Sequence, residues 1–306
     1  MLNGLAGKTA VLTGAGSGFG WECMCIAAKA GMQLVLVDVQ ADALAASAER
    51  ARSLGAAHVM ACKVDVGNAQ AMEALAAEVK DSFGAPHFVF NNAGVGGSGG
   101  LLWEQSVRDW EWVLNVNLWG VIHGVRVFTP MMLDAAAQDP TWQGHIVNTA
   151  SMAGLLAPPN MGVYNVSKHA VVSLTETLYQ DLRLVTDQLH CSVLCPYFVP
   201  TGIANSERNR HDVVDVSQLT ASQKIARAMT QKAVSSGKVS AQDIASKVFA
   251  AMADNQFYIF SHPHALGNVR VRMEDILELQ NPRDAFSDRP EVGAQLRAAL
   301  RGTLAA

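Results

Sequence analysis

The sequence predicts an α/β fold built on a doubly wound parallel sheet with helices on both faces. Two observations lead to this fold class. Short runs of β-branched and other apolar residues alternate along the chain with alanine-rich stretches of helical length. These apolar runs are continuous instead of alternating with polar residues, which is typical of parallel strands covered by helices on both faces.

Seven strands are expected, over residues 9–14, 33–38, 58–65, 87–94, 145–151, 191–196 and 257–261. Helices are expected between them, over residues 21–31, 41–55, 68–83, 106–136 and 164–186. Gly31 ends the first helix, because glycine readily takes the left-handed conformation that follows a helix. The chain has no internal repeat and no linker, so we interpret residues 1–306 as a single domain.

Residues 201–240 differ from the rest of the chain, because they are polar and weakly periodic. A long irregular insert in a compact fold is often a lid or a binding loop. The alternative is a plain surface excursion. The segment follows a predicted sheet strand, on the side where open α/β sheets bind ligands, so we favour a lid.

The composition argues against several classes of protein. The chain is 50% hydrophobic and 16% charged, with a net charge of −4 and a pI of about 6.1, so nucleic acid and anionic membranes are not expected partners. No apolar run reaches the ~18 residues of a membrane span, and residues 1–14 do not resemble a signal peptide. Five cysteines without a C-x-x-C pair indicate reduced thiols. We therefore expect a cytoplasmic location.

The stretch TGAGSGFG, residues 13–20, leaves the first predicted strand and enters the first predicted helix. That context is the one required for a dinucleotide site, whereas glycines alone also serve ordinary turns. Gly14 permits the tight turn, Gly18 lets the backbone approach a pyrophosphate, and Gly20 lets the helix pack close to the sheet. With Ser17 and Phe19 between them, these residues predict a Rossmann-like phosphate-binding turn at a helix N-terminus.

Asp38 ends the second predicted strand, about twenty residues beyond the glycines. A carboxylate there can accept hydrogen bonds from the ribose hydroxyls of NAD, and it would repel the 2′-phosphate of NADP. Neither Ser17 nor residues 39–42 supply an arginine or lysine for that phosphate. Asp38 could instead cap the following helix, although Asp42 fits that cap better. We predict NAD as the preferred cofactor.

The stretch YNVSK places Tyr164 and Lys168 one helical turn apart, and Ser151 stands thirteen residues before the tyrosine. Side chains at i and i+4 meet on any helix, so the pair alone is also compatible with a solvated face. A free tyrosine, with a pKa of about 10, is a poor base at neutral pH. A nearby ammonium group favours the phenolate, so Lys168 would make the phenol usable for proton transfer.

Taken together, these motifs resemble the single-domain short-chain dehydrogenase/reductase family, over about residues 5–260. The family pattern T-G-x-x-x-G-x-G is matched by Thr13, Gly14, Gly18 and Gly20, and N-N-A-G by Asn91, Asn92, Ala93 and Gly94. The resemblance implies four catalytic residues, namely Asn117, Ser151, Tyr164 and Lys168. In that scheme Ser151 binds the reacting oxygen and Lys168 reaches the cofactor ribose. Asn117, if its helix is distorted, holds a water that relays protons.

The resemblance also implies further cofactor contacts, at Asp65, Val66, Asn92, Ala93, Gly94, Tyr164, Lys168, Pro196, Val199 and Thr201. Tyr197 departs from the pattern, because the family often has glycine after Pro196. The alternatives without a catalytic role are that Ser151 caps a strand end and that Asn117 is a turn-exposed helix residue. The histidines show no convincing ligand spacing, so no metal is expected.

The substrate pocket is expected to be apolar. The segment MAGLLAPPNMGV, residues 152–163, lies between Ser151 and Tyr164, Tyr197 and Phe198 face it, and Trp103 is expected to approach from the 95–103 loop. We therefore predict hydride transfer between NAD and a lipophilic or aromatic secondary alcohol or its ketone.

Two other functions stay open, a 3-oxoacyl-type reductase of lipid metabolism and a non-catalytic NAD-sensing scaffold. The family resemblance implies a homotetramer or homodimer that pairs through the helices at 106–136 and 164–186. Residues 262–306 form a helical extension that covers either the substrate cleft or a neighbouring subunit.

Overall fold

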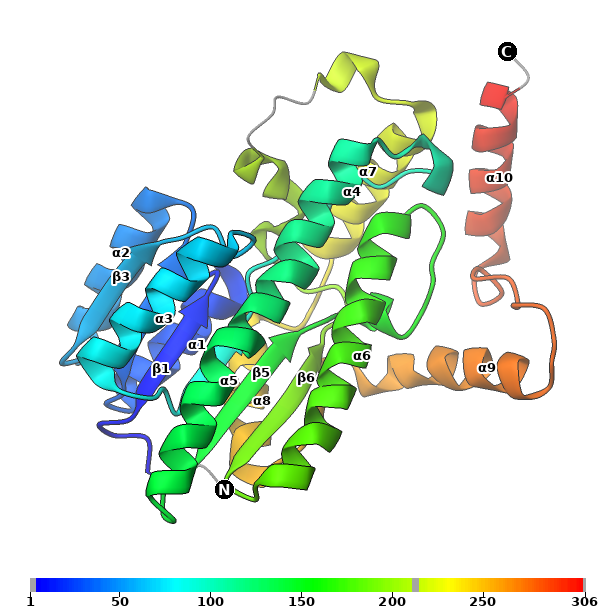
Figure 1. The fold of residues 1–306 in the computed structure, drawn as a ribbon. Helices are drawn as coiled ribbons and strands as arrows, with labels where there is room; N and C mark the ends of the chain where they lie inside the picture. Colours follow the sequence, from blue (N-terminus) through cyan, green and yellow to red (C-terminus); the bar gives the residue numbers. More distant parts are fainter. Residues whose placement is uncertain (1–3, 211–214, 305–306) are drawn as a thin grey trace.

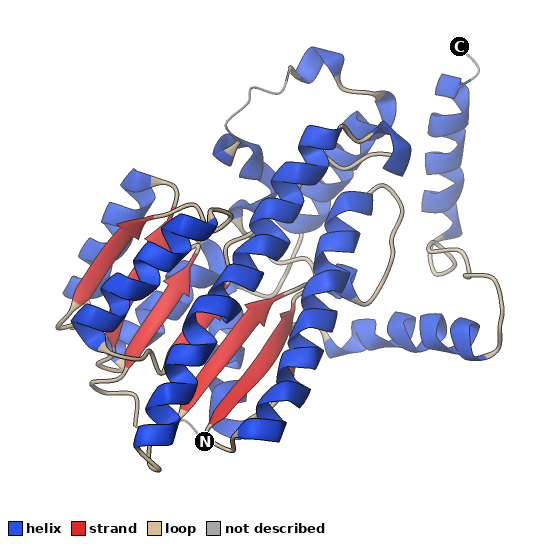
Figure 2. Ribbon diagram, in the orientation of Figure 1, coloured by secondary structure: helices blue, strands red, loops and turns tan. Residues whose placement is uncertain are grey.

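A computed structural model describes residues 4–210 and 215–304. In this part of the chain, seven strands form one parallel sheet with the order β3-β2-β1-β4-β5-β6-β7 (Figures 1 and 2). The strands are β1 (Thr9–Thr13), β2 (Gln33–Asp38), β3 (Val59–Lys63), β4 (Phe88–Asn91), β5 (Gly144–Thr149), β6 (Leu189–Cys195) and β7 (Tyr258–Phe260). Each corresponds to a predicted strand, and the doubly wound parallel fold class is confirmed.

Helices cover both faces of this sheet (Figure 1). The α-helices of the described residues are α1 (Gly18–Lys29), α2 (Ala41–Ser53), α3 (Ala69–Phe83), α4 (Val107–Leu114), α5 (Gly120–Gln138), α6 (Gly162–Val185), α7 (Ala221–Ser235), α8 (Ala241–Asp254), α9 (Leu266–Leu277) and α10 (Pro290–Leu304). Helices α1, α2 and α8 pack on one face, and α3, α5 and α6 on the other.

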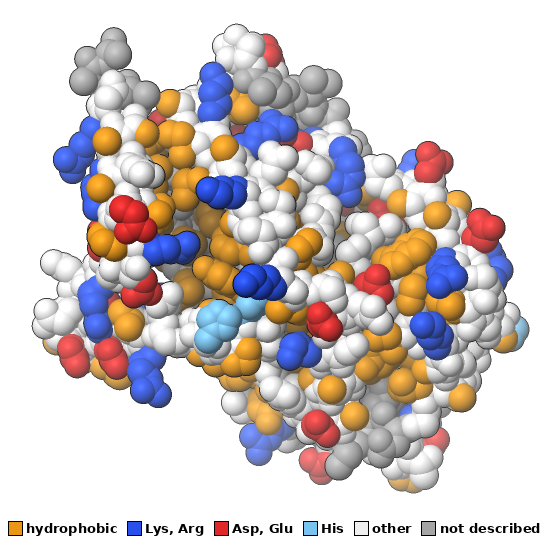
Figure 3. All heavy atoms as spheres, turned by 180° about the vertical axis from the view of Figure 1, so that it is seen from behind, with side chains coloured by type: hydrophobic (Ala, Val, Ile, Leu, Met, Phe, Trp, Pro, Cys, Tyr) orange, Lys and Arg blue, Asp and Glu red, His pale blue; other side chains and the backbone are white. Residues whose placement is uncertain are grey.

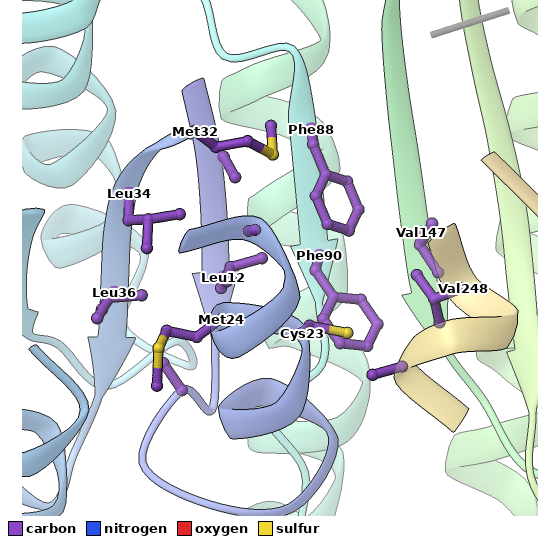
Figure 4. Close-up of a cluster of buried hydrophobic side chains, with 14 of the residues drawn as sticks. Leu12, Cys23, Met24, Met32, Leu34, Leu36, Phe88, Phe90, Val147 and Val248 are labelled. Atoms are coloured by element: carbon purple, nitrogen blue, oxygen red, sulfur yellow. The ribbon is translucent and has the colours of Figure 1, made fainter. Parts of the chain in front are cut away.

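Successive side chains of each strand point to opposite faces, so each face has its own core. On the first face, Leu12 and Phe90 of the sheet meet Met24 of α1 and Val248 of α8 (Figure 4). On the second face, the cluster joins residues of β1, β2, β4 and β5 to α3, α5 and α6, and its Phe128 is fully buried. Burying one such large side chain contributes about 1.5–3 kcal/mol, so these two layers hold the strand ends in place.

The strand order reverses between β1 and β4, which lie side by side although 77 residues separate Thr13 from Phe90. The Thr13 hydroxyl donates to the Phe90 carbonyl (3.2 Å) and accepts from the backbone N–H groups of Asn92 (2.9 Å) and Ala93 (3.0 Å). Asn92 Nδ2 returns a bond to the Thr13 carbonyl (3.0 Å). Ligands of open α/β sheets bind at such a reversal, outside the carboxyl ends of the strands.

Three parts of the chain differ from the expected helices and loops. The helix predicted over 106–136 is divided, because a π-helical turn (Asn115–Trp119) lies between α4 and α5. The segment predicted as irregular over 201–240 contains α7, whose first turn is closed by a capping box between Thr220 and Gln223. Helix α8 had no predicted counterpart. Residues 211–214 of the predicted lid lie outside the described residues.

Helices α9 and α10 form a C-terminal arm, residues 266–304, that stands away from the body in Figure 1, although α10 contacts α7. From behind, the surface is hollowed between arm and body, and hydrophobic side chains show there (Figure 3). Arm residues Leu277 and Leu279 are 81% and 92% exposed. Among the described residues, no helix combines the length and the apolar character needed to span a bilayer.

Histidines lie at the amino-terminal ends of three neighbouring strands: His87 precedes β4, and His145 and His190 lie near the starts of β5 and β6. The His145 ring is buried, and its Nε2 atom lies 2.7 Å from the hydroxyl oxygen of Ser192. Burial lowers the pKa of His145 to about 3 and that of His87 to about 4, and it also lowers the pKa of His190.

The lowered pKa values of these buried histidines make the fold less stable in acid. Below about pH 6.5 the unfolded chain takes up a proton on His145 that the folded chain does not bind, so stability is lost as the pH falls. Each such group should lower the free energy of unfolding by about 1.4 kcal/mol per pH unit, down to its folded pKa. Urea unfolding between about pH 7.5 and about pH 5 measures the slope, and His145→Gln should reduce it by one proton. An equal slope in both proteins would contradict the prediction.

Candidate active site

The glycine turn joins β1 to α1 through close backbone contacts. Gly14 has a φ of +65° and lies against Ala93, since a Cβ on Gly14 would be 3.0 Å from the Ala93 Cα. A Cβ on Gly20 would be 2.1 Å from the Gly14 carbonyl oxygen, so α1 can leave the turn only without a side chain there. Ser17 is the N-cap of α1, but its side chain makes no capping hydrogen bond. The first-turn N–H groups are therefore not capped by it.

Asp38 closes this turn from the end of β2. Its Oδ2 accepts from the backbone N–H of Gly16 (2.8 Å), and its Oδ1 accepts from that of Gln40 (2.9 Å). Gln40 is the N-cap of α2 without a side-chain bond, and Asp42 lies inside the first turn of that helix. Asp42 is therefore not the cap that the sequence suggested. A carboxylate has about four acceptor sites, so Asp38 retains sites for a ligand hydroxyl beside Gly16.

Ser151, Tyr164 and Lys168 meet beyond the carboxyl ends of β5 and β6. The Ser151 hydroxyl donates to the Pro196 carbonyl (3.3 Å) and accepts from the Ala153 N–H (3.1 Å), so it also caps the short helix after β5. Tyr164 lies in the first turn of α6 and is hydrogen-bonded to Ser151. Lys168, one turn on, donates from Nζ to the Thr149 carbonyl (2.9 Å), and its Nζ is 5.6 Å from the centre of the Tyr164 ring.

The protonation of this group differs from the simple expectation. Burial raises the pKa of Tyr164 above its ordinary value of 10, and the hydrogen bond with Ser151 acts in the opposite direction. Burial also lowers the pKa of Lys168 to about 8. At neutral pH the lysine therefore remains mostly charged, but desolvation of the phenol outweighs any help from it. In the chain itself, burial therefore opposes the downward pKa shift that Lys168 and an oxidised nicotinamide together are expected to produce.

Asn117 lies inside the π-helical turn and is fully buried. Its Oδ1 accepts from the N–H of Val95 (2.8 Å), and its Nδ2 donates to the Val95 carbonyl (2.9 Å) and to Ser167 (3.2 Å). The helix distortion that the water-holding role requires is present, because π turns change the usual backbone pairing. The side chain is occupied in fixing the chain after β4, and the alternative of a turn-exposed residue is excluded.

One cavity of about 1090 Å³ brings most of the predicted residues together. The predicted residues that line it are Gly14, Ser17, Gly18, Phe19, Asp38, Asp65, Val66, Asn92, Ala93, Gly94, Ser151, Tyr164, Lys168, Pro196, Val199 and Thr201. Gly20 and Asn117 do not line it, because Gly20 packs on Gly14 and Asn117 is held behind the wall. The cavity extends past Ser151 and Tyr164 to an apolar wall of Leu156, Pro158, Met161, Tyr197 and Phe198.

Several lining residues were not predicted. Trp110 and Trp112 of α4 line the cavity, whereas Trp103 is 75% exposed and does not. Helix α7 adds Thr230 and Val234. The capping-box sequence TASQ at 220–223 was a signal for α7, but no local pattern indicated which face of the helix turns to the cavity.

Among the described residues, no group of three or more histidine, cysteine or acidic side chains is arranged to hold a metal ion. The parallel sheet carries a glycine turn at the strand reversal, and a serine, a tyrosine and a lysine lie at the same edge. This combination defines a class of α/β oxidoreductases. Comparison with known proteins identifies the family.

Residues 8–212 match the family model for short chain dehydrogenase. The CLA biosynthesis dehydrogenase/reductase of Lactiplantibacillus plantarum is 31% identical over 225 residues, which cover 72% of this chain and 76% of that protein. The 1-deoxy-11-beta-hydroxypentalenate dehydrogenase of Streptomyces avermitilis is 30% identical over 269 residues, 88% of this chain and 89% of its own.

The crystal structure of a short chain dehydrogenase/reductase from Burkholderia phymatum in complex with NAD is similar over nearly the whole chain. Its sequence is 51% identical, the TM-score is 0.88, and the match covers 94% of this chain and 100% of that one. The protein described here belongs to the short-chain dehydrogenase/reductase family of oxidoreductases.

The close packing at Gly20 gives a test of the turn. Gly20→Ala places a methyl group against the Gly14 backbone, so it should lower the free energy of unfolding by about 1–3 kcal/mol, as overpacking does. Gly267→Ala in α9 is the control, because a Cβ there meets nothing within 4 Å and should stabilise by up to about 1 kcal/mol. Urea unfolding measures both. A Gly20→Ala protein as stable as the native one would contradict the packing argument.

Proposed function

We propose that this protein is an NAD-dependent oxidoreductase that interconverts a lipophilic or aromatic secondary alcohol and its ketone, with Tyr164 as the general acid–base. The observation that carries the proposal is the shared cavity, which is lined by the glycine turn at one end and by Ser151, Tyr164 and Lys168 further along. The 51% identity to a relative in complex with NAD supports the choice of cofactor.

The residues of the turn fit a dinucleotide. The first-turn N–H groups of α1 suit a pyrophosphate, because Ser17 does not cap them and a helix N-terminus favours anions. The spare acceptor sites of Asp38 suit the ribose hydroxyls, and Asp65 and Val66 line the cavity where an adenine would lie. When bound, NAD supplies the hydride acceptor and a positive ring charge. The side chains of the protein supply binding, orientation and proton transfer.

Proton transfer rests on Tyr164. With its raised pKa the phenol is protonated at neutral pH, the form that donates a proton to a ketone oxygen during reduction. Alcohol oxidation needs the phenolate, which the charged Lys168 favours from 5.6 Å together with any positive charge brought by the cofactor. Ser151 holds the reacting oxygen beside the phenol, to which it is already hydrogen-bonded. Asn117 acts by fixing Val95 at the cavity wall.

The apolar wall supports the substrate class. Leu156, Pro158 and Met161 lie on one segment, and Tyr197 and Phe198 on another, so a substrate beyond Ser151 meets mainly hydrocarbon. A hydrophobic alcohol or ketone loses little on entering such a space, whereas a sugar or a phosphate ester would leave its polar groups unpaired.

The assembly and the location complete the proposal. Val166, Leu184 and Val185 are exposed on α6, as is Trp119 just before α5, which supports pairing of two or four copies through these helices. The cytoplasmic location stays a proposal that rests on the reduced cysteines expected from the sequence. The domain organisation also belongs to the proposal: one domain over residues 1–306, a lid over 201–240 and a C-terminal extension over 262–306.

The first experiment follows NADH formation at 340 nm with NAD or NADP across aliphatic, aromatic and steroidal secondary alcohols. Tyr164→Phe should lower kcat by about 100-fold or more, the range for losing a general acid–base, while NADH still binds. Because oxidation needs the phenolate, its rate in the native enzyme should rise with pH, and the ketone reduction rate should fall. Most of the activity remaining in Tyr164→Phe would exclude this residue as the base. NADH binding without turnover of any alcohol would favour the sensing scaffold.

The cofactor preference gives a second prediction. Asp38→Ala should weaken NAD binding by about 1–3 kcal/mol, roughly 5- to 150-fold in Kd, because charge-assisted hydrogen bonds to the ribose are lost. It should also raise the ratio of NADP to NAD activity, since the charge that repels the 2′-phosphate is gone. This ratio separates the effect from general disorder of the turn, which would weaken both cofactors alike. The control is Asp42→Ala, an exposed carboxylate on α2. Equal use of both cofactors by the native enzyme would refute the assignment of Asp38.

A further inference from the structure

The chain after β6 forms a cover over the cavity. We call residues 201–210 the strap; its short helix (Gly202–Asn209) begins with Thr201 as N-cap. Ile203, Ser206 and Asn209 of the strap line the same cavity as the glycine turn. The strap also approaches two glycines closely: a Cβ on Gly18 would be 3.4 Å from Thr201, and one on Gly96 would be 3.2 Å from the Ile203 carbonyl oxygen.

Three hydrogen bonds fasten the strap to three other parts of the chain. The backbone N–H of Gly96, after β4, donates to Ser206 Oγ (2.9 Å). Gln40, two residues beyond Asp38, donates from Nε2 to Asn209 Oδ1 (2.8 Å). Arg210 donates from Nη1 to Asp109 Oδ1 on α4 (2.6 Å). Since these partners belong to the loops after β2 and β4 and to α4, the strap connects opposite sides of the cavity.

The bond between Arg210 and Asp109 is a buried ion pair, with side chains only 3% and 10% exposed. The guanidinium also lies 4.8 Å from the centre of the Trp112 ring. Asp109 is held independently of the strap, because its Oδ2 accepts from the N–H and hydroxyl of Ser106 in the capping box of α4, and Ser98 donates to its Oδ1. One partner is therefore part of a rigid helix end, and the other belongs to the cover.

Such a pair fixes geometry more than it stabilises the fold. The cost of removing two charges from water nearly cancels their attraction, so a buried ion pair adds little over an apolar contact of the same size. Breaking it by removing Arg210 is costly, however, because the charge of Asp109 then stays buried without the guanidinium. The ion pair between Arg210 and Asp109 therefore holds the strap in one closed position. The strap opens only when this ion pair breaks.

We propose that Asp109 and Arg210 are positioning residues that hold the strap closed over the dinucleotide, so that opening of this ion pair controls cofactor release. The inference rests on the proposed function, because it requires a nicotinamide cofactor in the cavity. The cofactor enters and leaves past the bonds at Gly96 and Gln40, and these can open together only when the end of the strap at Arg210 is released.

The test is the rate of NADH release, followed by stopped-flow fluorescence in native protein, Arg210→Met, Asp109→Asn and the double variant. Asparagine can still accept the bond from Ser106 while its amide N–H group faces Arg210, so the end of α4 is kept. Each single variant should release NADH at least about tenfold faster, and raise KM for NAD more than it changes kcat. The double variant should be no faster than either single one, because each single variant has already broken the ion pair.

Arg227→Gln is the matched control. Arg227 of α7 forms an ion pair with Glu207 of the same strap (3.1 Å), but its side chain is 42% exposed, and the variant should release NADH at the native rate. A second measurement needs no cofactor: trypsin cleavage after Arg208 should be faster in Arg210→Met than in native protein or Arg227→Gln. Native rates of NADH release in both single variants would overturn the inference and leave the proposed function intact. Absence of NADH binding to native protein would overturn the proposed function itself.

Discussion

The hydrogen-bonded joint between Thr13 and Asn92 is the constraint on which the rest of the site depends. It ties the end of β1 to the end of β4, where the sheet changes direction, and so fixes the glycine turn against the chain that follows β4. Thr149 extends the joint to β5 by donating to Asn92 (3.3 Å), and Lys168 is bonded to the Thr149 carbonyl. A continuous path of hydrogen bonds thus sets the phosphate end of the cavity relative to its reacting end, with little freedom between them.

Burial gives the reacting end its particular electrostatics. It favours the neutral form of both Tyr164 and Lys168, and so moves the two pKa values apart: that of the phenol rises above 10, whereas that of the ammonium group falls from 10.5 to about 8. The phenol therefore keeps its proton to a higher pH than a free tyrosine, and the lysine gives up its proton more readily than a free lysine. In the proposed function, the desolvation that suits a hydrophobic substrate therefore also sets the protonation of Tyr164 and Lys168.

Local patterns predicted the strands, the glycine turn and the group of Ser151, Tyr164 and Lys168. Buried strands and turns can be predicted in this way because they depend mainly on residues that are neighbours in the sequence. The sequence failed where tertiary contacts decide. Nothing in a polar, weakly periodic segment indicates that Arg210 pairs with Asp109, 101 residues earlier. The upward effect of burial on the pKa of Tyr164 is hidden for the same reason: the spacing of a lysine is visible in a sequence, whereas the depth of burial is not.

The histidines at the amino-terminal ends of β4, β5 and β6 lie at the opposite edge of the sheet from the cavity. Under the proposed function, catalytic titration and acid unfolding therefore depend on groups separated by the full length of the strands. Replacing buried histidines would extend the working range of the protein toward acid without altering the chemistry of its reaction, and a change in the reacting residues would leave its acid limit unmoved. The two edges of one sheet can thus be engineered, or can diverge among relatives, independently.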